Sequence, residues 1–334
     1  MEKYQIRIGY ACINNDLRQD DIFTSRSLIL RTAAEKGLDY IKQLIIANVN
    51  DLLKILIYNE AHGIRFFRIT SCLFPHLGNP KFADGNYDIS FVKDKLKIIG
   101  AYAKRHGHRL TMHPGQFVQL GSLNNEIVKQ SFIDLANHVK LLKMMDYMPT
   151  DGSVLIIHGG GTFGDKMETL KRWKTNFLLL PKEIRSYISL ENDENSYGID
   201  DLLPLCESLN IPFCLDLFHN QVSKNHITIT KKLLSRIFNT WKNRSIIPKI
   251  HYSQQQPNLR RGAHSQKLER LPLYLFAIPQ MLNTNLDIML EVKDKEQSVF
   301  RMYYKYFDIH MDKTGRITYR PKKQLTDKIK KYLK

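Results

Sequence analysis

Carboxylate residues stand where several short apolar segments of the chain end. The segment Tyr187–Glu191 finishes at Glu191, and two other segments of the same kind lead to Asp216 and Glu291. Apolar strand residues are normally buried, so a carboxylate delivered at the tip of such a strand has to be matched by an opposite charge. Three converging carboxylates would repel one another, and the pattern therefore predicts cations between them.

Histidines occupy comparable places along the chain. A single histidine at a strand end is usually a hydrogen-bonded structural residue. Packing alone, however, predicts apolar strand ends, so the recurrence over successive segments favours metal ligands. Imidazole and carboxylate together suit Zn²⁺, Mn²⁺ or Fe²⁺. The histidines in question are His76 in SCLFPH, His113 in HPGQF, His158 in HGGG, His219 in DLFH, His251 in KIHYS and His264 in GAHS.

Eight short segments with strand character would position these residues, and eight stretches with helical spacing separate them. This alternation, without a Gly/Ser or Pro linker, favours a single (β/α)8 TIM barrel over two doubly wound domains. The carboxyl ends of the strands then meet at one face. The predicted strands are Ile6–Ala11, Phe66–Cys72, Arg109–His113, Val154–His158, Tyr187–Glu191, Pro212–Asp216, Pro248–Tyr252 and Asp287–Val292. The predicted helices are Leu38–His62, Phe91–His106, Glu126–Met145, Met167–Leu180, Leu202–Leu209, Thr230–Trp241, Gln266–Met281 and Gln297–Phe307.

The barrel is expected to span residues 1–310 and to be followed by a basic tail, residues 311–334. Nine Lys or Arg residues and one acid lie between Lys313 and Lys334. Two interpretations stay open for this tail, a solvated terminus and an arm that contacts phosphates.

Composition points to a polyanionic partner. The 334 residues include 50 Lys and Arg against 33 Asp and Glu, a formal net charge of +17. Such a charge attracts nucleic acid first and a membrane surface second. We find no apolar segment of membrane-spanning length and no signal-peptide pattern, and expect a soluble, intracellular protein. The four cysteines lack metal-binding spacing, which indicates reduced core residues.

In order and spacing, the motifs SCLFPH, HPGQF, HGGG, SLEND, DLFH, KIHYS, GAHS and EVKDKE resemble those of the UV damage endonucleases, relatives of endonuclease IV among the xylose-isomerase-like barrels. The resemblance covers about Ile8 to Glu296. It implies an enzyme that nicks damaged double-stranded DNA 5′ of a UV photoproduct or an abasic site, leaving a 3′-hydroxyl and a 5′-phosphate. It also implies up to three divalent metals, commonly manganese, with Zn²⁺ or Fe²⁺ as alternatives.

The resemblance implies a ligand set and a catalytic group. Glu191, Lys249, His251 and Glu291 are the expected catalytic residues, with Glu191 bridging two metals. The implied ligands are His76, His113, His158, Glu191, Asp216, His219, His251, His264 and Glu291.

Lys249 stands where endonuclease IV has a carboxylate, two residues before the histidine. The resemblance suggests that it is carboxylated to N6-carboxylysine, which would restore an anionic ligand. The alternative is an unmodified lysine that faces a substrate phosphate.

The lesion must leave the base stack to reach such a site. The resemblance places a probing wedge at Gln116 and Phe117 and contacts with the opposite strand at Tyr10 and Asn14. Barrel-rim packing is the alternative for Phe117. Contacts with the DNA backbone are expected from Arg18, Arg26, Arg260, Arg261 and Lys267.

The chain departs from the family pattern around two ligands. Phe218 and Asn220 flank His219 where the family often has further histidines, and Gln266 stands where an acid is common. The competing functions are an abasic-site endonuclease without photoproduct activity, a sugar isomerase and a non-catalytic DNA-binding barrel. The protein is expected to be a monomer.

Overall fold

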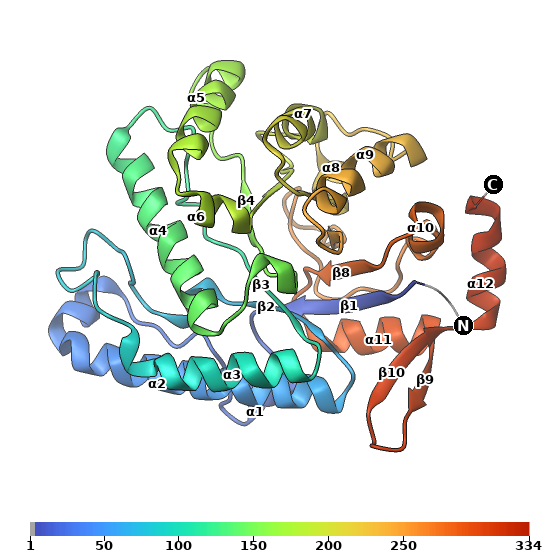
Figure 1. The fold of residues 1–334 in the computed structure, drawn as a ribbon, viewed down its shortest axis with the longest axis horizontal. Coiled ribbons are helices and arrows are strands. Elements are labelled where there is room, and N and C mark those ends of the chain that lie inside the picture. Colours follow the sequence, from blue (N-terminus) through green and yellow to red (C-terminus); the bar gives the residue numbers. More distant parts are fainter. Residues whose placement is uncertain (1–3, 334) are drawn as a thin grey trace.

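The computed structural model describes residues 4–333, and eight of their strands close into a parallel barrel (Figure 1). Each strand pairs with its neighbours in sequence, and β1 pairs with β8. The predicted barrel is confirmed. The strands are β1 Ile6–Ala11, β2 Phe66–Ile69, β3 Arg109–Met112, β4 Leu155–His158, β5 Ile188–Glu191, β6 Phe213–Asp216, β7 Lys249–Tyr252 and β8 Leu286–Leu290.

Helices surround the barrel, and seven of the eight predicted ones lie close to their predicted places (Figure 1). Gly37, with φ 75°, interrupts α2, so the predicted helix from Leu38 follows a short helical segment in the connection after β1. The helices are α1 Asn15–Gln19, α2 Leu30–Ala61, α3 Lys93–Arg105, α4 Asn125–Met144, α5 Lys166–Leu179, α6 Lys182–Tyr187, α7 Ile199–Leu209, α8 Leu217–Val222, α9 Lys231–Lys242, α10 Tyr274–Leu282, α11 Glu296–Tyr306 and α12 Lys323–Ile329.

The helix predicted at Gln266–Met281 is wrong in its first half, because α10 begins only at Tyr274. Pro272 disfavours helical geometry in the residue before it. The extended segment is held by side chains of α11 instead. The backbone N–H of Leu268 donates to the Ser298 hydroxyl at 2.9 Å, and that of Leu271 donates to the Tyr306 hydroxyl at 3.2 Å.

A buried ion-pair triad closes the amino-terminal end of the barrel interior. Asp287 accepts hydrogen bonds from Arg7 at 2.6 and 2.7 Å and from Arg109 at 2.7 Å. Arg109 also donates to the carbonyl oxygens of Gly152 and Ile247. Burial raises the pKa of Asp287, but the two guanidinium groups outweigh it and hold that pKa below its ordinary value. The triad therefore fills this end of the barrel with paired charges rather than with apolar side chains, although Nη2 of Arg109 has no hydrogen-bond partner among the residues described.

The residues after the barrel form an ordered unit of a hairpin and a helix. Strands β9 Phe307–Met311 and β10 Ile317–Pro321 pair antiparallel, and α12 follows. The Tyr319 ring stacks on Tyr303 with centroids 3.6 Å apart, and its hydroxyl donates to the His62 carbonyl. The expected tail boundary after residue 310 falls inside β9. Because residue 62 precedes β2, this basic unit lies at the barrel end opposite the carboxyl ends of the strands.

In the part of the chain that the structure describes, no helix combines the length and the apolar character needed to cross a membrane. The cysteines are all free: Cys206 and Cys214 are buried as expected, whereas Cys72 is exposed and Cys12 is half-buried. The prediction of four core cysteines is therefore correct for two of them.

Candidate active site

Six neighbouring strands bring the predicted acidic and imidazole residues to one end of the barrel. His158, Glu191 and Asp216 are the last residues of β4, β5 and β6. His113 and Glu291 directly follow β3 and β8, and His251 is the third residue of β7, while His219 lies in the first turn of α8. Side chains at alternate strand positions share a face, and these residues take the inward positions at the carboxyl ends.

Their ligand atoms form three overlapping groups, within each of which all atoms lie within 4.8 Å of one another. Glu191 belongs to two of the groups, and Asp216 also belongs to two. The overlap makes one continuous cluster rather than separate sites. The groups are His113, His158 and Glu191; Glu191, Asp216 and His219; and Asp216, His251 and Glu291.

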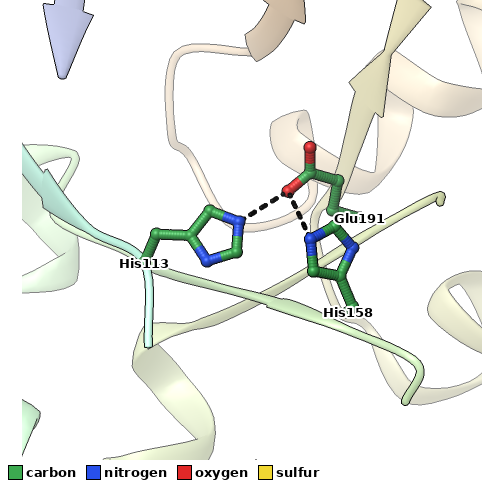
Figure 2. Close-up of side chains that lie close together, drawn as sticks. All are labelled: His113, His158 and Glu191. Carbon is green, nitrogen blue, oxygen red and sulfur yellow. Dashed lines mark hydrogen bonds and ion pairs between the residues drawn. The ribbon is translucent and has the colours of Figure 1, made fainter. Parts of the chain in front are cut away.

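Figure 2 shows the first group, in which two imidazoles point at one carboxylate. Nε2 of His113 lies 3.1 Å and Nε2 of His158 lies 3.8 Å from Oε2 of Glu191. Nδ1 of His113 donates to the Pro114 carbonyl at 3.0 Å, which leaves Nε2 of a neutral ring with a lone pair. Burial lowers the pKa values of both histidines, so both rings are neutral. A lone pair and a carboxylate oxygen this close require a proton or a cation between them.

Asn192, the residue after Glu191, helps to position the histidine of the second group. Nδ1 of His219 lies 3.5 Å from Oδ2 of Asp216 and 3.8 Å from Oε1 of Glu191. The same nitrogen donates to the Asn192 carbonyl at 3.0 Å. Asp216 caps α8 by accepting from the His219 backbone N–H, which places His219 one turn above it. The cap of a short helix thus brings a histidine beside two carboxylates.

An arginine outside the third group pairs with one of its carboxylates. Nδ1 of His251 lies 2.7 Å from Glu191 Oε1 and 3.1 Å from Glu291 Oε1. Arg68 of β2 also donates to Glu291. Burial raises the pKa of Glu291, but the Arg68 guanidinium is the largest opposing cause, and that pKa is held well below its ordinary value. Glu291 is therefore ionised.

The pKa of Glu191 is shifted in the opposite direction to that of Glu291. Burial first, and then the charges of Glu291 and Asp216, raise the pKa of Glu191 well above its ordinary value. This is the repulsion expected of converging carboxylates without cations between them. A cation bound between these carboxylates would lower that pKa again.

Three buried atoms of the cluster find no hydrogen-bond partner among the residues described: Oδ2 of Asp216, Nε2 of His251 and Nδ1 of His158. Buried polar atoms are normally paired, because leaving them unpaired costs about 1–3 kcal/mol each. Unpaired oxygen and imidazole nitrogen atoms within a cluster of carboxylates match the donor set of a divalent metal centre. The residues present therefore fit such a group.

His264 lies beside the cluster. Its ring centroid is 5.8 Å from that of His219, and its Nδ1 donates to the Glu291 carbonyl at 2.8 Å. This bond leaves its other nitrogen available, although His264 is outside the three groups.

His76, by contrast, lies apart from the three groups. Its Nε2 donates to the Leu28 carbonyl at 2.8 Å and its Nδ1 faces the Asn79 amide. The prediction that His76 is a metal ligand is not supported by this placement, because both of its nitrogens are engaged elsewhere.

Lys249 is fully buried inside the barrel, one inward position below His251. Its Nζ donates to the Thr111 hydroxyl at 3.3 Å. Burial lowers the pKa of Lys249 to about 8. A completely buried amine does not face solvent or a substrate phosphate in this state, so the second of the two predicted roles is not favoured by its position.

Tyr10 and Asn14 are fully buried, contrary to the prediction that they contact DNA. The Tyr10 hydroxyl donates to Asn59 Oδ1 at 2.7 Å and accepts from Asn14 Nδ2 at 2.9 Å. Asn14 also caps α1 by accepting from the Leu17 backbone N–H. The side chains of Tyr10 and Asn14 therefore connect the segment after β1 to α2 by hydrogen bonds. This placement corrects the prediction that they contact DNA.

The predicted wedge lies at the surface. Gln116 is exposed and Phe117 is 77% exposed, so rim packing does not account for Phe117. Gln119 holds this loop against the glycine run after β4: Nε2 donates to the Gln116 carbonyl and Oε1 accepts from the Gly161 N–H. A Cβ at Gly159 would lie 2.5 Å from the Tyr197 ring. The glycine run therefore permits close packing of neighbouring loops beside His158.

Among the predicted phosphate-contacting residues, Arg260, Arg261, Arg18 and Lys267 are exposed. Arg26 instead pairs with Asp51 at 2.7 Å and stacks on the Phe23 ring. Arg26 is thus engaged in holding the connection after β1.

Sequence reasoning missed three residues that support the site: Arg68, Gln119 and Asn192. Arg68 is the one charge in an apolar strand, which is the same signal that identified Glu191. Asn192 follows Glu191 directly, but its contacts with Asp216 depend on two strands being adjacent. Gln119 offered no signal beyond its place in the loop after His113.

Comparison with known proteins agrees with this geometry. Residues 6–319 match the sequence profile of the family described as UV-endonuclease UvdE. The chain belongs to this UV-endonuclease family. A protein of Acanthamoeba polyphaga mimivirus, named as a proposed UV-damage endonuclease, is 64% identical over 316 residues, which are 95% of this chain and 96% of that protein. The UV-damage endonuclease of Schizosaccharomyces pombe is 36% identical over 314 residues, 90% of this chain but 50% of the yeast protein.

A solved structure also resembles this member of the family. The crystal structure of SacUVDE superposes with a TM-score of 0.77 at 31% identity, over 89% of this chain and 96% of that chain. The two chains therefore share the same barrel fold.

Proposed function

We propose that the protein is a DNA repair endonuclease that nicks the phosphodiester 5′ of UV photoproducts, and of abasic sites, by metal-dependent hydrolysis. Three overlapping ligand groups at the mouth of the barrel carry this proposal. Membership of the UV-endonuclease family and the names of the relatives support damaged DNA as the substrate. The product ends would be a 3′-hydroxyl and a 5′-phosphate.

The cluster would hold up to three divalent ions, and we propose manganese as the physiological one. The proposed ligands are the members of the three groups together with His264. A bound divalent ion lowers the pKa of an attacking water and offsets charge on the phosphate. The neutral state of His113, His158 and His251 leaves their lone pairs free for this role.

Glu191 is the proposed bridging residue. Its Oε2 faces His113 and His158, and its Oε1 faces His251 and His219. One carboxylate therefore contacts both sides of the cluster and can orient the water whose oxygen attacks phosphorus. The bond to the 3′ oxygen then breaks, and that oxygen takes a proton to become the 3′-hydroxyl.

Lys249 is the proposed site of carboxylation. Its burial beneath His251 brings an amine next to the acidic cluster, and a carbamate there would add an anionic oxygen pair. Mass spectrometry of the native protein under bicarbonate should show an added carbon dioxide on the peptide that contains Lys249. A free amine at full metal occupancy would exclude the modification.

Recognition of the lesion is assigned to the loop after β3. The ring of Phe117 and the amide of Gln116 would fill the gap that a displaced lesion leaves, and their exposure supports this role. Arg260 and Arg261, exposed on the loop after β7, are proposed to contact backbone phosphates. We propose that one chain suffices and that the enzyme acts inside the cell, where its DNA substrate is.

Duplexes of one sequence test the proposal directly. One carries a photoproduct, one an abasic site and one no lesion, and each is labelled at its 5′ end and incubated with Mn²⁺. The expected product is a nick immediately 5′ of either lesion, with an end that a polymerase can extend. Cleavage at the abasic site alone would identify an abasic-site endonuclease instead. Binding without cleavage under Mn²⁺, Zn²⁺ and Fe²⁺ would identify a DNA-binding barrel.

A further inference from the structure

The loop after β4 contains an aromatic residue in an unfavourable backbone conformation. Phe163 has φ 45° and Gly164 has φ 87°, so two consecutive residues lie in the left-handed region and form a turn. Such turns favour Asn-Gly or Gly-Gly at these positions, because a side chain with a Cβ is strained there. A phenylalanine at this position therefore costs about 1 kcal/mol or more relative to glycine.

The surrounding loop holds this conformation firmly. The Gly161 N–H donates to Gln119, and the Gly161 carbonyl accepts from the Tyr197 hydroxyl at 3.2 Å. The Thr162 carbonyl accepts from the Thr169 hydroxyl at 2.6 Å. The two residues that precede the turn are thus held in place. Strain retained in this way at the edge of a site is a feature of residues that act on a ligand.

The ring of Phe163 is placed at the surface rather than in the core. It folds over Gly161, where a Cβ would lie 3.4 Å from two ring atoms, yet 38% of the residue stays exposed. Gln119 joins this loop to the loop that carries Phe117. Two exposed aromatic rings therefore stand on adjoining loops, after β3 and β4, beside the cluster residues His113 and His158.

We propose that Phe163 is a second aromatic contact for DNA, on which a nucleobase next to the lesion stacks. The inference rests on the proposed function. Stacking is the recognition chemistry that an exposed, rigidly held ring offers to a base, and it does not depend on base identity. Phe117 would fill the gap in the stack, whereas Phe163 would support a base displaced toward the rim. The net charge of +17 attracts DNA to the protein as a whole but does not provide such a contact.

Four variants separate the ring from the backbone strain. Phe163→Ala and Phe163→Gly both remove the ring, but only glycine relieves the left-handed conformation. Phe163→Tyr keeps a ring. Met167→Ala is the matched control, because Met167 is also exposed and lies four residues later. The dissociation constant is measured for an abasic duplex and for the undamaged duplex, and Tm is measured for each protein without DNA.

We expect Phe163→Ala and Phe163→Gly to bind the abasic duplex about tenfold more weakly than the wild type. Phe163→Tyr and Met167→Ala should bind it as the wild type does. The glycine variant should have a Tm about 1–3 °C above that of the alanine variant while binding equally weakly. Unchanged binding by the glycine variant, or binding that simply follows Tm, would overturn the inference. Failure of the wild type to nick any damaged duplex would instead overturn the proposed function.

Discussion

Asn192 and Asp216 are joined by two reciprocal hydrogen bonds of 2.9 Å each. The side-chain amide of Asn192 donates to the Asp216 carbonyl and accepts from the Asp216 N–H. Both residues are fully buried. Asn192 thereby continues the pairing of β5 with β6 by one step, using its side chain in place of backbone. Its own carbonyl holds His219, so one residue sets the positions of two members of the cluster.

Replacing Asn192 with alanine should weaken metal binding as well as folding. The change leaves the Asp216 N–H buried without a partner, and we expect the free energy of unfolding to fall by about 1–3 kcal/mol. Mn²⁺ affinity, measured by calorimetry, should fall about 10- to 100-fold because the ligands lose their support. Asn195→Ala, an exposed change three residues later, is the control. Wild-type Mn²⁺ affinity in the Asn192 variant would contradict the positioning role.

Glu191→Gln should separate catalysis from DNA binding. An amide keeps the shape of the carboxylate but not its charge, so we expect the nicking rate to fall by about 100- to 1000-fold. Binding of damaged duplex should stay within about twofold, because the exposed loops are untouched. Rate and affinity are compared with those of Glu207→Gln, which alters an exposed ion pair with Arg236. Equal loss of nicking and binding would indicate that Glu191 is structural.

Phe117→Ala should reduce nicking of damaged duplex without affecting stability. The ring is largely exposed, so the free energy of unfolding should change by less than about 0.5 kcal/mol. Loss of a stacking wedge should slow nicking of a photoproduct duplex about tenfold. Nicking rates on the photoproduct duplex and urea unfolding provide the two measurements. An unchanged nicking rate would remove Phe117 from lesion recognition.

Tyr10→Phe, unlike Phe117→Ala, should lower the stability of the protein without changing its discrimination between damaged and undamaged DNA. Removing the buried hydroxyl takes away a hydrogen-bond partner of Asn59 Oδ1 and Asn14 Nδ2. The free energy of unfolding should therefore fall by about 1–3 kcal/mol. The ratio of nicking rates on damaged and undamaged duplex should match that of the wild type below the variant's Tm. A change in this ratio at unaltered stability would restore the predicted contact between Tyr10 and DNA.

Acid should remove the contribution of Asp287 to stability. Its pKa is lower in the folded protein than in the unfolded chain, so the stabilisation is complete above the unfolded value of about 3.9 and is lost as pH falls through the folded value. At pH 7, Asp287→Asn should cost about 3–5 kcal/mol because the buried Arg109 and the partly buried Arg7 lose their anionic partner. Urea unfolding with a chelator should show a smaller difference from the wild type at pH 3 than at pH 7. An equal difference at both values would contradict the assigned charge state.

The strands were predictable from sequence because each is a short apolar run, and their polar ends identified most of the cluster. Predictions failed where the chain leaves a strand by a long connection. His76 is seven residues beyond β2, after a short 3₁₀ turn at Ser71–Leu73, and its direction cannot be inferred from strand alternation. Tyr10 alternates correctly, but it points outward to the helices rather than inward, and its burial follows from contacts with α2 that lie far away in sequence.

Tertiary contacts also decide the structure after the barrel. Residues 311–333 are too polar to predict a packed unit, yet Tyr319 stacks on Tyr303 and Leu325 and Ile329 are buried. The partner surfaces for these side chains exist only once the barrel has closed. The same dependence explains why Asn192 carried no recognisable signal although its neighbour Glu191 did.

A plasmid assay tests the requirement for metal at the cluster most directly. Supercoiled plasmid, either UV-irradiated or untreated, is incubated with metal-stripped protein, with Mn²⁺ added back, or with Mn²⁺ and excess chelator. The cluster described above predicts conversion of irradiated plasmid to the open circle with Mn²⁺, and background levels in both metal-free reactions and with untreated plasmid. Equal nicking of irradiated plasmid in the presence of excess chelator would contradict it.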